Sequence, residues 1–352
     1  MPIGQRTASK RRLQMRTGGT RLAYTKRMKH SHETLPIIDL SSPDVPALAR
    51  KLDQACRDIG FIVVCGHGVP AITVQAAFDA GFAFFNAPQT IRASAVPPDR
   101  RVRGFTPMLG QQLAGSMDQQ TPPDLFERFR MGPFQFQDDA YHRSRSAGWF
   151  APNVWPQGLP GFRPALEAYY KAMEGLAAQL MRLFARALDL PTGYFDGSIG
   201  RHISSLCLNH YPALHSPALP GQLRAGEHTD YGSLTIVAPT PAPGRLQVLT
   251  RENDWIEVAP APGHFVVNIG DLMAQWTNDR WVSTLHRVAL PDAHDGPLAR
   301  RLSLVFFHQP DDDALVECIP TCLVAGEAPR HTPITSGEHL RLKVNRHLTR
   351  PA

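Results

Sequence analysis

From residue 201 onward, short runs rich in β-branched and aromatic residues alternate with Gly, Pro, Asn and Asp. Such runs are typical of strands, and the residues between them are typical of turns. The runs are HISSLCLNHY, SLTIVAP, RLQVLT, WIEVAP, HFVVNIG, VSTLHRVAL, RLSLVFF and ALVECIP. Many short strands at this spacing predict a sandwich or barrel, here a jelly roll. We therefore expect a mainly β protein with flanking helices (α+β), whose jelly-roll core, a double-stranded β-helix, spans residues 201–335.

Helical patterns surround this expected core. Residues 43–59 place apolar side chains at helical spacing, and Ser42 before them is a favoured N-cap residue. The longest helix is expected over 163–190, where one apolar face would pack on the sheet. We assign 35–200 to an N-terminal region of helices and strands that flanks the core, and 336–352 to a C-terminal helix and tail.

Residues 95–160 are rich in Pro, Gln and Gly and show no clear period. We expect long loops there, which often carry function and which, with the C-terminal tail, would line a substrate pocket. Four arginines in this segment raise the idea of an anionic substrate: Arg101, Arg103, Arg128 and Arg130. The alternative is that these arginines are solvated surface charges, as exposed arginines usually are.

The composition indicates a globular protein. Hydrophobic residues make up 43% of the 352 residues and charged residues 19%. No apolar run is long enough to cross a membrane. Five cysteines at scattered spacing argue against a disulfide framework and for a reducing compartment, so we expect a cytoplasmic protein.

The basic charge is concentrated at the N-terminus. Residues 1–32 hold nine Lys or Arg and no acid, so the other 320 residues carry 6 − 9 = −3 of the net charge of +6. Residues 1–34 are therefore expected to be a disordered basic tail or the product of a misassigned start, with Met28 as another start. The remaining chain has no basic stripe or aromatic platform, so we expect neither a nucleic-acid nor a membrane partner.

A histidine and a carboxylate stand two residues apart in GEHTDYGSLTIV, at His228 and Asp230. On a strand, residues i and i+2 project to the same face, so the two side chains could share one ion. A third ligand is available at His286, 56 residues beyond Asp230. Two imidazoles and one carboxylate that leave open positions form the arrangement used by non-haem Fe(II) oxygenases.

A possible anchor for an anion follows in RRLSLVFF, fifteen residues past His286. Arg301 and Ser303 share strand spacing, so both can point into one cavity. A guanidinium binds a carboxylate through two parallel hydrogen bonds, and a hydroxyl adds one more. The pair suits a dicarboxylic co-substrate whose other end chelates the metal.

In these motifs the sequence resembles the Fe(II)/2-oxoglutarate-dependent dioxygenases of the isopenicillin N synthase type. The resemblance covers most of the chain from about residue 35 and is carried, in family order, by LPIIDLS, GFIVVCGHGVP, LNHYP, HTDYGSLTIV, STLHRV and RRLSLVFF. It implies that iron is held by His228, Asp230 and His286. It also implies that 2-oxoglutarate is bound by Arg301, Ser303, Asn209 and Tyr211.

The resemblance further implies an oxidoreductase of secondary metabolism that hydroxylates, desaturates or cyclises a small-molecule metabolite. Its co-substrates would be 2-oxoglutarate and O2, its products would include succinate and CO2, and ascorbate would stimulate it. We expect a monomer or a weak homo-oligomer.

Three other functions are compatible with these residues. The nearest is an oxidase of the same fold that works without 2-oxoglutarate, such as the namesake synthase or the ethylene-forming oxidase, because these also carry the R-x-S pair. A zinc hydrolase is the second, since two histidines and an aspartate also bind zinc. A non-catalytic binding protein is the third.

Overall fold

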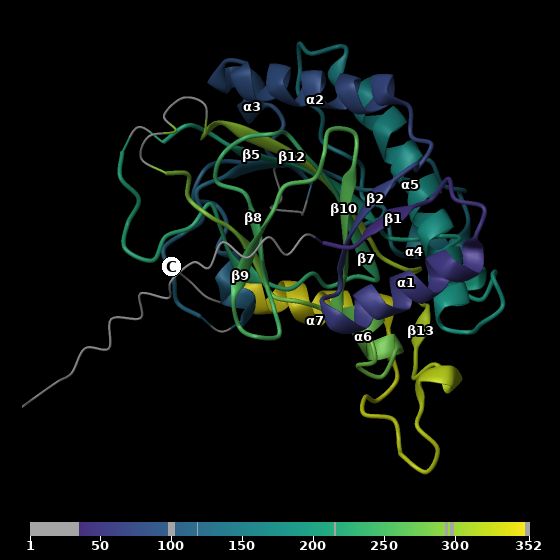
Figure 1. The fold of residues 1–352 in the computed structure, drawn as a ribbon. Helices are drawn as coiled ribbons and strands as arrows, with labels where there is room; N and C mark the ends of the chain where they lie inside the picture. Colours follow the sequence, from purple (N-terminus) through teal and green to yellow (C-terminus); the bar gives the residue numbers. More distant parts are fainter. Residues whose placement is uncertain are drawn as a thin grey trace, which may run out of the picture.

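The computed structural model describes residues 35–97, 103–117, 119–214, 216–292, 295 and 299–348 (Figure 1). The expected basic tail (1–34) and Arg101 lie outside the described residues. Among the described residues, no helix is both long and apolar enough to cross a membrane.

Two β-sheets form the centre of the molecule. The larger has the strand order β1 (Ile37–Asp39), β2 (Phe61–Cys65), β10 (Phe265–Ile269), β7 (Leu234–Pro239), β12 (Arg301–His308), β5 (Ser205–Tyr211), β4 (Glu127–Met131) and β3 (Gly104–Thr106). The smaller has the order β6 (Ala225–His228), β11 (His286–Val288), β8 (Leu246–Leu249) and β9 (Trp255–Val258). A hairpin-like pair, β13 (Leu315–Val316) and β14 (Ile334–Thr335), stands apart from both. The expected mainly β fold with a jelly-roll core and flanking helices is confirmed.

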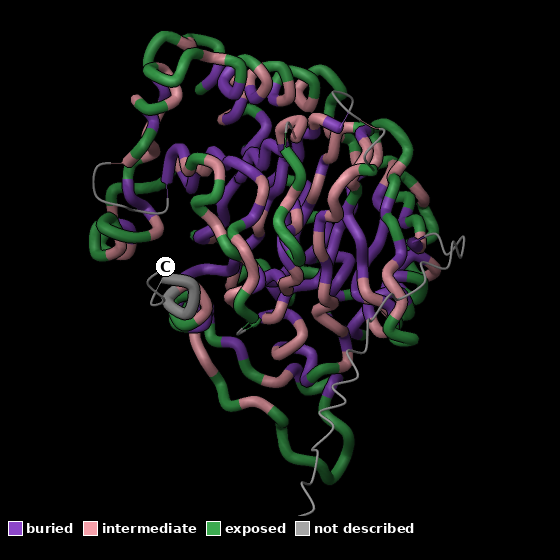
Figure 2. The backbone as a smooth tube through the Cα atoms, turned by 90° about the vertical axis from the view of Figure 1, so that its left-hand side faces the viewer, coloured by how far each residue is buried: buried purple, intermediate pink, exposed green. Residues whose placement is uncertain are grey.

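Helices cover the outer face of the larger sheet. Those that contact this sheet are α1 (Val45–Asp58), α2 (Ala71–Asn86) and α5 (Phe162–Ala187). The other helices are α3 (Gln89–Ala93), α4 (Ala140–Ser144), α6 (Asp271–Trp276) and α7 (Ser336–Leu348). The α1 and α2 helices pack on α5, and both α2 and α5 contact β12. Figure 2 shows the result: the strands are mostly buried, while exposed backbone gathers on the peripheral helices and loops.

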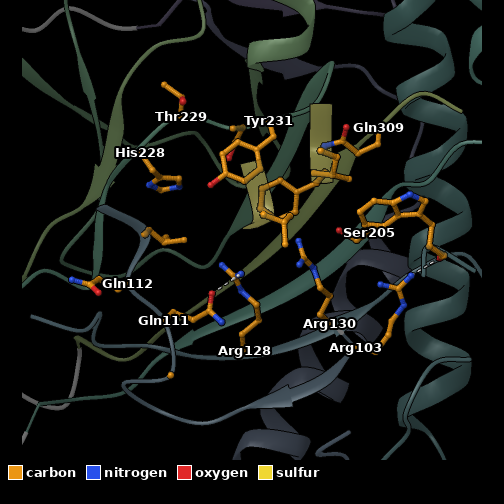
Figure 3. A pocket seen from close by; sticks show the side chains of 17 residues that line it. Arg103, Gln111, Gln112, Arg128, Arg130, Ser205, His228, Thr229, Tyr231 and Gln309 are labelled. Carbon is orange, nitrogen blue, oxygen red and sulfur yellow. Dashed lines mark hydrogen bonds between the residues drawn. The ribbon is translucent and has the colours of Figure 1, made fainter. Parts of the chain in front are cut away.

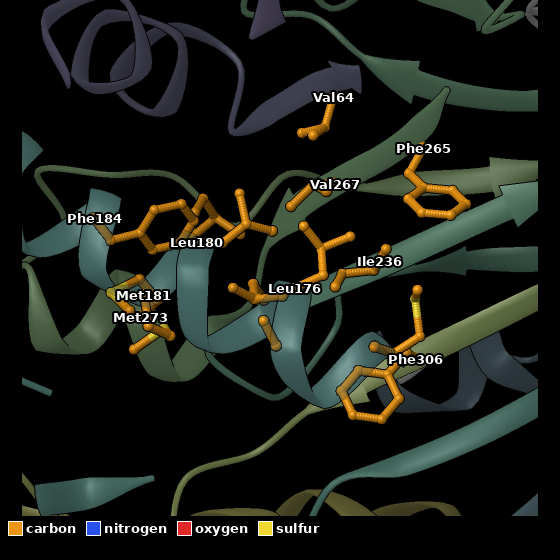
Figure 4. Close-up of a cluster of buried hydrophobic side chains, with 14 of the residues drawn as sticks. Val64, Leu176, Leu180, Met181, Phe184, Ile236, Phe265, Val267, Met273 and Phe306 are labelled. Carbon is orange, nitrogen blue, oxygen red and sulfur yellow. The ribbon is translucent and has the colours of Figure 1, made fainter. Parts of the chain in front are cut away.

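The main hydrophobic core lies between α5 and the larger sheet (Figure 4). On α5, Leu176, Leu180 and Phe184 project toward side chains such as Ile236 of β7 and Val267 of β10. Since successive strand residues point to opposite faces, the intervening residues of the central strands point away from the helices. These side chains face the interior between the two sheets, where the polar residues gather.

The structure corrects two expectations about local elements. The first helix begins at Val45 with Asp44 as its N-cap, not Ser42, because Asp44 Oδ1 accepts a hydrogen bond from the Ala47 amide at 2.9 Å. The segment 95–160 is not loop throughout, because it contains β3, β4 and a short 3₁₀ helix, η1 (Leu113–Met117). The strand β6 was also not among the expected runs.

Candidate metal centre and the adjoining cavity

His228 and His286 lie directly opposite each other on neighbouring antiparallel strands. His228 ends β6, His286 begins β11, and the two residues pair in the sheet register. Their ring centroids are 4.3 Å apart. The pairing brings together two histidines that are 58 positions apart in the sequence.

The hydrogen bonds of the two rings fix which nitrogen faces the centre. Nδ1 of His228 lies 2.7 Å from the Gly226 carbonyl oxygen, and Nδ1 of His286 lies 3.0 Å from that of Thr284. A carbonyl oxygen only accepts hydrogen bonds, so each Nδ1 carries the proton. In a neutral ring whose proton is on Nδ1, Nε2 keeps a free lone pair, which is the state that a metal requires.

Asp230 reaches the histidines from the connection between β6 and β7 and not from a strand. The strand ends at His228, so the expected reason for their convergence, a shared strand face, is wrong. Asn268 of β10 instead holds the carboxylate, donating from Nδ2 to Asp230 Oδ2 at 2.7 Å. This connection depends on close packing of two glycines, because a Cβ added at Gly270 would lie 2.2 Å from the Gly232 carbonyl oxygen.

The protonation states suit metal binding at neutral pH. Burial, and then the neighbouring His286, lower the pKa of His228 to about 3, so this imidazole is neutral. Burial opposes ionisation of Asp230. The two imidazoles and hydrogen bonds from Thr235 and Asn268 outweigh it, so the pKa of Asp230 lies below its ordinary value.

The three side chains fit a divalent metal ion. One ligand atom from each of His228, Asp230 and His286 lies within 4.8 Å of the others, and His286 Nε2 is 3.8 Å from Asp230 Oδ1. Two imidazoles and one carboxylate on one side of an ion match the donor set of non-haem iron.

The four residues expected to bind 2-oxoglutarate share one face of the larger sheet. Arg301 of β12 pairs with Tyr211 of β5, and Ser303 pairs with Asn209. All four residues are buried, and Arg301 is only 3% exposed. Arg301 Nε lies 3.4 Å from Ser303 Oγ. Among the described carboxylates, none forms an ion pair with Arg301, so its charge is available to a ligand.

A cavity of about 230 Å³ opens beside His228 and Asp230 (Figure 3). Its other walls come from β3 and η1 with their flanking residues, from β4, from the segment around Trp149 and from α7. The expectation that residues 95–160 and the C-terminal segment line a pocket is therefore confirmed. Arg103 and Arg128 are each 7% exposed, so the alternative that they are solvated surface charges is wrong.

Asp312 connects two of these wall segments, the one around Trp149 and α7, and was not anticipated from the sequence. Its carboxylate accepts hydrogen bonds from Arg145 Nε at 2.7 Å, Trp149 Nε1 at 2.7 Å and Arg341 Nη1 at 2.9 Å. Burial works against its ionisation, but these donors outweigh it and keep the pKa of Asp312 below its ordinary value. Asp312 thereby positions Trp149 and α7 at the rim of the cavity.

Asp124 makes a similar link at the opposite wall. It accepts hydrogen bonds from the Leu113 amide at 2.7 Å and from the Gly226 amide at 2.8 Å, which joins η1 to β6. Burial raises its pKa to about 6 despite these bonds. An isolated aspartate in a Pro-rich stretch gives no signal from which this role could have been predicted.

Two family models match the chain. Residues 35–158 match the N-terminal region described as non-haem dioxygenase in morphine synthesis, and residues 202–310 match the 2OG-Fe(II) oxygenase superfamily. The chain is 31% identical to validamycin A dioxygenase of Streptomyces hygroscopicus subsp. limoneus, over 88% of this chain and 86% of the relative. It is 30% identical to homoarginine-6-hydroxylase 2-ODD-233 of Oryza sativa subsp. japonica, over 90% of this chain and 98% of the relative.

A solved structure is similar over nearly the same length. Full-length T7H of Neurospora crassa, in complex with alpha-KG, superimposes with a TM-score of 0.75 and 28% identity, covering 90% of this chain and 96% of that one.

Proposed function

Because the chain belongs to the 2OG-Fe(II) oxygenase superfamily and is a 2-oxoglutarate-dependent dioxygenase acting on a small molecule, we propose that His228, Asp230 and His286 are its iron ligands. The observation that carries this assignment is the state of the two imidazoles. Each donates from Nδ1 to a backbone carbonyl, so two Nε2 lone pairs point to the side on which the carboxylate of Asp230 lies. When bound, Fe(II) supplies the activation of O2 that couples decarboxylation of 2-oxoglutarate to oxidation of the substrate.

The remaining residues orient the reactants. Arg301 binds the distal carboxylate of 2-oxoglutarate through its two-pronged guanidinium, and Ser303 adds a hydroxyl donor. Tyr211 and Asn209 stand beside them on the paired strand and complete the co-substrate site. Asn268 keeps the carboxylate of Asp230 in one orientation. A ligand set positioned in this way needs little rearrangement when the metal binds.

Hydroxylation of a small-molecule metabolite, with release of succinate and CO2, is the reaction we assign. The enzyme works in the cytoplasm as a monomer or weak homo-oligomer, without a nucleic-acid or membrane partner. The five free cysteines support a reducing compartment, because no disulfide forms between them.

The experiment that tests the metal ligands measures iron content and succinate release together. His228→Ala and His286→Ala should each lose most bound iron and all turnover, since two remaining ligands hold a divalent ion poorly. The matched control is His331→Ala, because that histidine is 38% exposed and pairs with Asp279 away from the centre. Full iron content and turnover in either test variant would remove that histidine from the site.

A further inference from the structure

The cavity beside the metal centre is lined by more positive than negative charge. Three arginines face it, and Asp230 is the one carboxylate among the described residues of its lining. Three positive charges against one negative charge leave +2. Fe(II) and the 2-oxoglutarate dianion cancel each other when both are bound, so this surplus persists in the loaded site.

The three guanidinium groups differ in the hydrogen-bond acceptors that the protein provides for them. Arg128 Nε donates to Asn209 Oδ1 at 2.8 Å, and its Nη1 lies 3.4 Å from Gln111 Oε1. Arg103 Nη2 donates to the Trp149 carbonyl oxygen. Arg130 has a buried Nε without an acceptor among the described residues, and none of the described carboxylates forms an ion pair with it.

Arg130 is nevertheless held in place. It lies on β4, where it pairs with Cys207 of β5, and its guanidinium carbon is 5.8 Å from the centre of the Phe307 ring. Figure 3 shows Arg103, Arg128 and Arg130 projecting from one wall of the cavity toward the side where His228 and Tyr231 lie. A buried donor without a protein acceptor is costly, so a ligand that supplies the acceptor gains affinity.

The rest of the lining mixes apolar with uncharged polar side chains. Phe307, Trp149, Leu340 and Val344 contribute to it, and the cavity of about 230 Å³ has room for a small molecule only. One guanidinium whose Nε has no acceptor and which has no carboxylate partner among the described residues matches one planar anion bound through two parallel hydrogen bonds, which is the geometry of a carboxylate. A phosphate monoester, with three acceptor oxygens and nearly two charges, would also need Arg103 or Arg128, and both of these already donate to protein acceptors.

From these observations we propose that the prime substrate is a small organic acid, whose carboxylate binds Arg130 and whose apolar body lies against Phe307, Trp149 and Leu340. This inference rests on the proposed function, because the cavity is then the place where the substrate meets the metal. Arg130 fixes the acid end of the molecule, so the position that is oxidised is set by its distance from that carboxylate.

The test uses the anaerobic protein loaded with Fe(II) and 2-oxoglutarate. The probes are a series of carboxylic acids from hexanoate to 4-phenylbutanoate, and each acid is compared with its primary amide. Phenyl phosphate is added as a probe of the phosphate monoester class. Binding is measured by calorimetry and by the change that a probe causes in the visible charge-transfer band. At least one acid should bind about 10- to 100-fold more tightly than its amide, the range expected for a charge-assisted hydrogen bond.

Arg130→Gln should remove that preference while leaving the affinities for 2-oxoglutarate and for the amide unchanged. Arg130→Lys, which keeps the charge but loses the planar fork, should retain part of it. The matched control is Arg50→Gln on the exposed face of α1, which should behave as wild type.

Several results would overturn the inference. They are a series in which no acid binds better than its amide, tighter binding of phenyl phosphate than of any acid, or loss of 2-oxoglutarate affinity instead of acid affinity in Arg130→Gln. The comparison of acids with amides in wild type decides the question even if the variants do not fold. Failure of the proposed function would look different, because the charge-transfer band would then be missing before any probe is added.

Discussion

Replacing Arg301 by Lys should weaken 2-oxoglutarate binding far more than iron binding. Arg301 is 3% exposed, pairs with Tyr211 across the sheet, and has its Nε 3.4 Å from Ser303 Oγ. Burial lowers its pKa, but an arginine stays charged at neutral pH. Lys keeps the charge and loses one of the two parallel hydrogen bonds to the distal carboxylate.

A charge-assisted hydrogen bond in such a site contributes about 1.5–3 kcal/mol, which corresponds to roughly a 10- to 100-fold change in affinity. The apparent constant for 2-oxoglutarate in Arg301→Lys should rise by that factor, measured as succinate formed against 2-oxoglutarate concentration with prime substrate saturating. Ser303→Ala removes a neutral donor and should raise the constant only about 2- to 10-fold.

Two results would refute this reasoning. In the first, Arg301→Lys changes only the apparent constant for the prime substrate, which would mean that the guanidinium binds the prime substrate and not 2-oxoglutarate. In the second, wild type oxidises its substrate without 2-oxoglutarate.

Two further predictions concern the carboxylates that hold the cavity walls. Asp312→Asn should lower the free energy of unfolding by about 1.5–3 kcal/mol in urea at pH 7 and raise the KM for the prime substrate, because Trp149 and α7 lose a charged acceptor. The control is Asp313→Asn at the half-exposed neighbouring carboxylate, and equal effects of the two variants would contradict the role of Asp312. Because the pKa of Asp312 is lowered, the stability that Asp312 contributes should persist at neutral pH and disappear only below about pH 4. The pKa of Asp124 is raised to about 6, so the folded state takes up a proton between pH 6 and about 4 that the unfolded state does not. The free energy of unfolding of wild type should therefore rise by about 2 kcal/mol relative to that of Asp124→Asn as the pH falls from 7.5 to 4.5. If the difference between the two proteins stayed constant over this pH range, Asp124 would not titrate in it.

The sequence was sufficient to predict those elements whose structure depends on the local residue pattern. The jelly-roll strands carry β-branched and aromatic runs that tertiary packing did not override, and the helix expected over 163–190 is α5 (Phe162–Ala187). The R-x-S pair was also readable, because Arg301 and Ser303 lie on one regular strand and therefore share a face.

Other features depend on contacts that the local sequence does not contain. The strand β4 reads ERFRM, and its charged side chains hide the alternation that would mark a strand. These charges are tolerated inside because Glu127 pairs with His210 and Arg128 donates to Asn209. The position of Asp230 depends on Asn268, 38 residues later, so the spacing of the motif brought Asp230 to the two histidines for a wrong geometric reason.

The most direct measurement of the central claim is the visible charge-transfer band of the anaerobic protein with Fe(II) and 2-oxoglutarate. If His228, Asp230 and His286 hold the iron that 2-oxoglutarate chelates, wild type should show the band only when both are present, saturating at one equivalent of iron. Asp230→Ala should lose it, because the remaining two imidazoles hold the ion too weakly. A wild-type protein without the band, or an Asp230→Ala variant that keeps it at one equivalent of iron, would contradict the assignment of this metal centre.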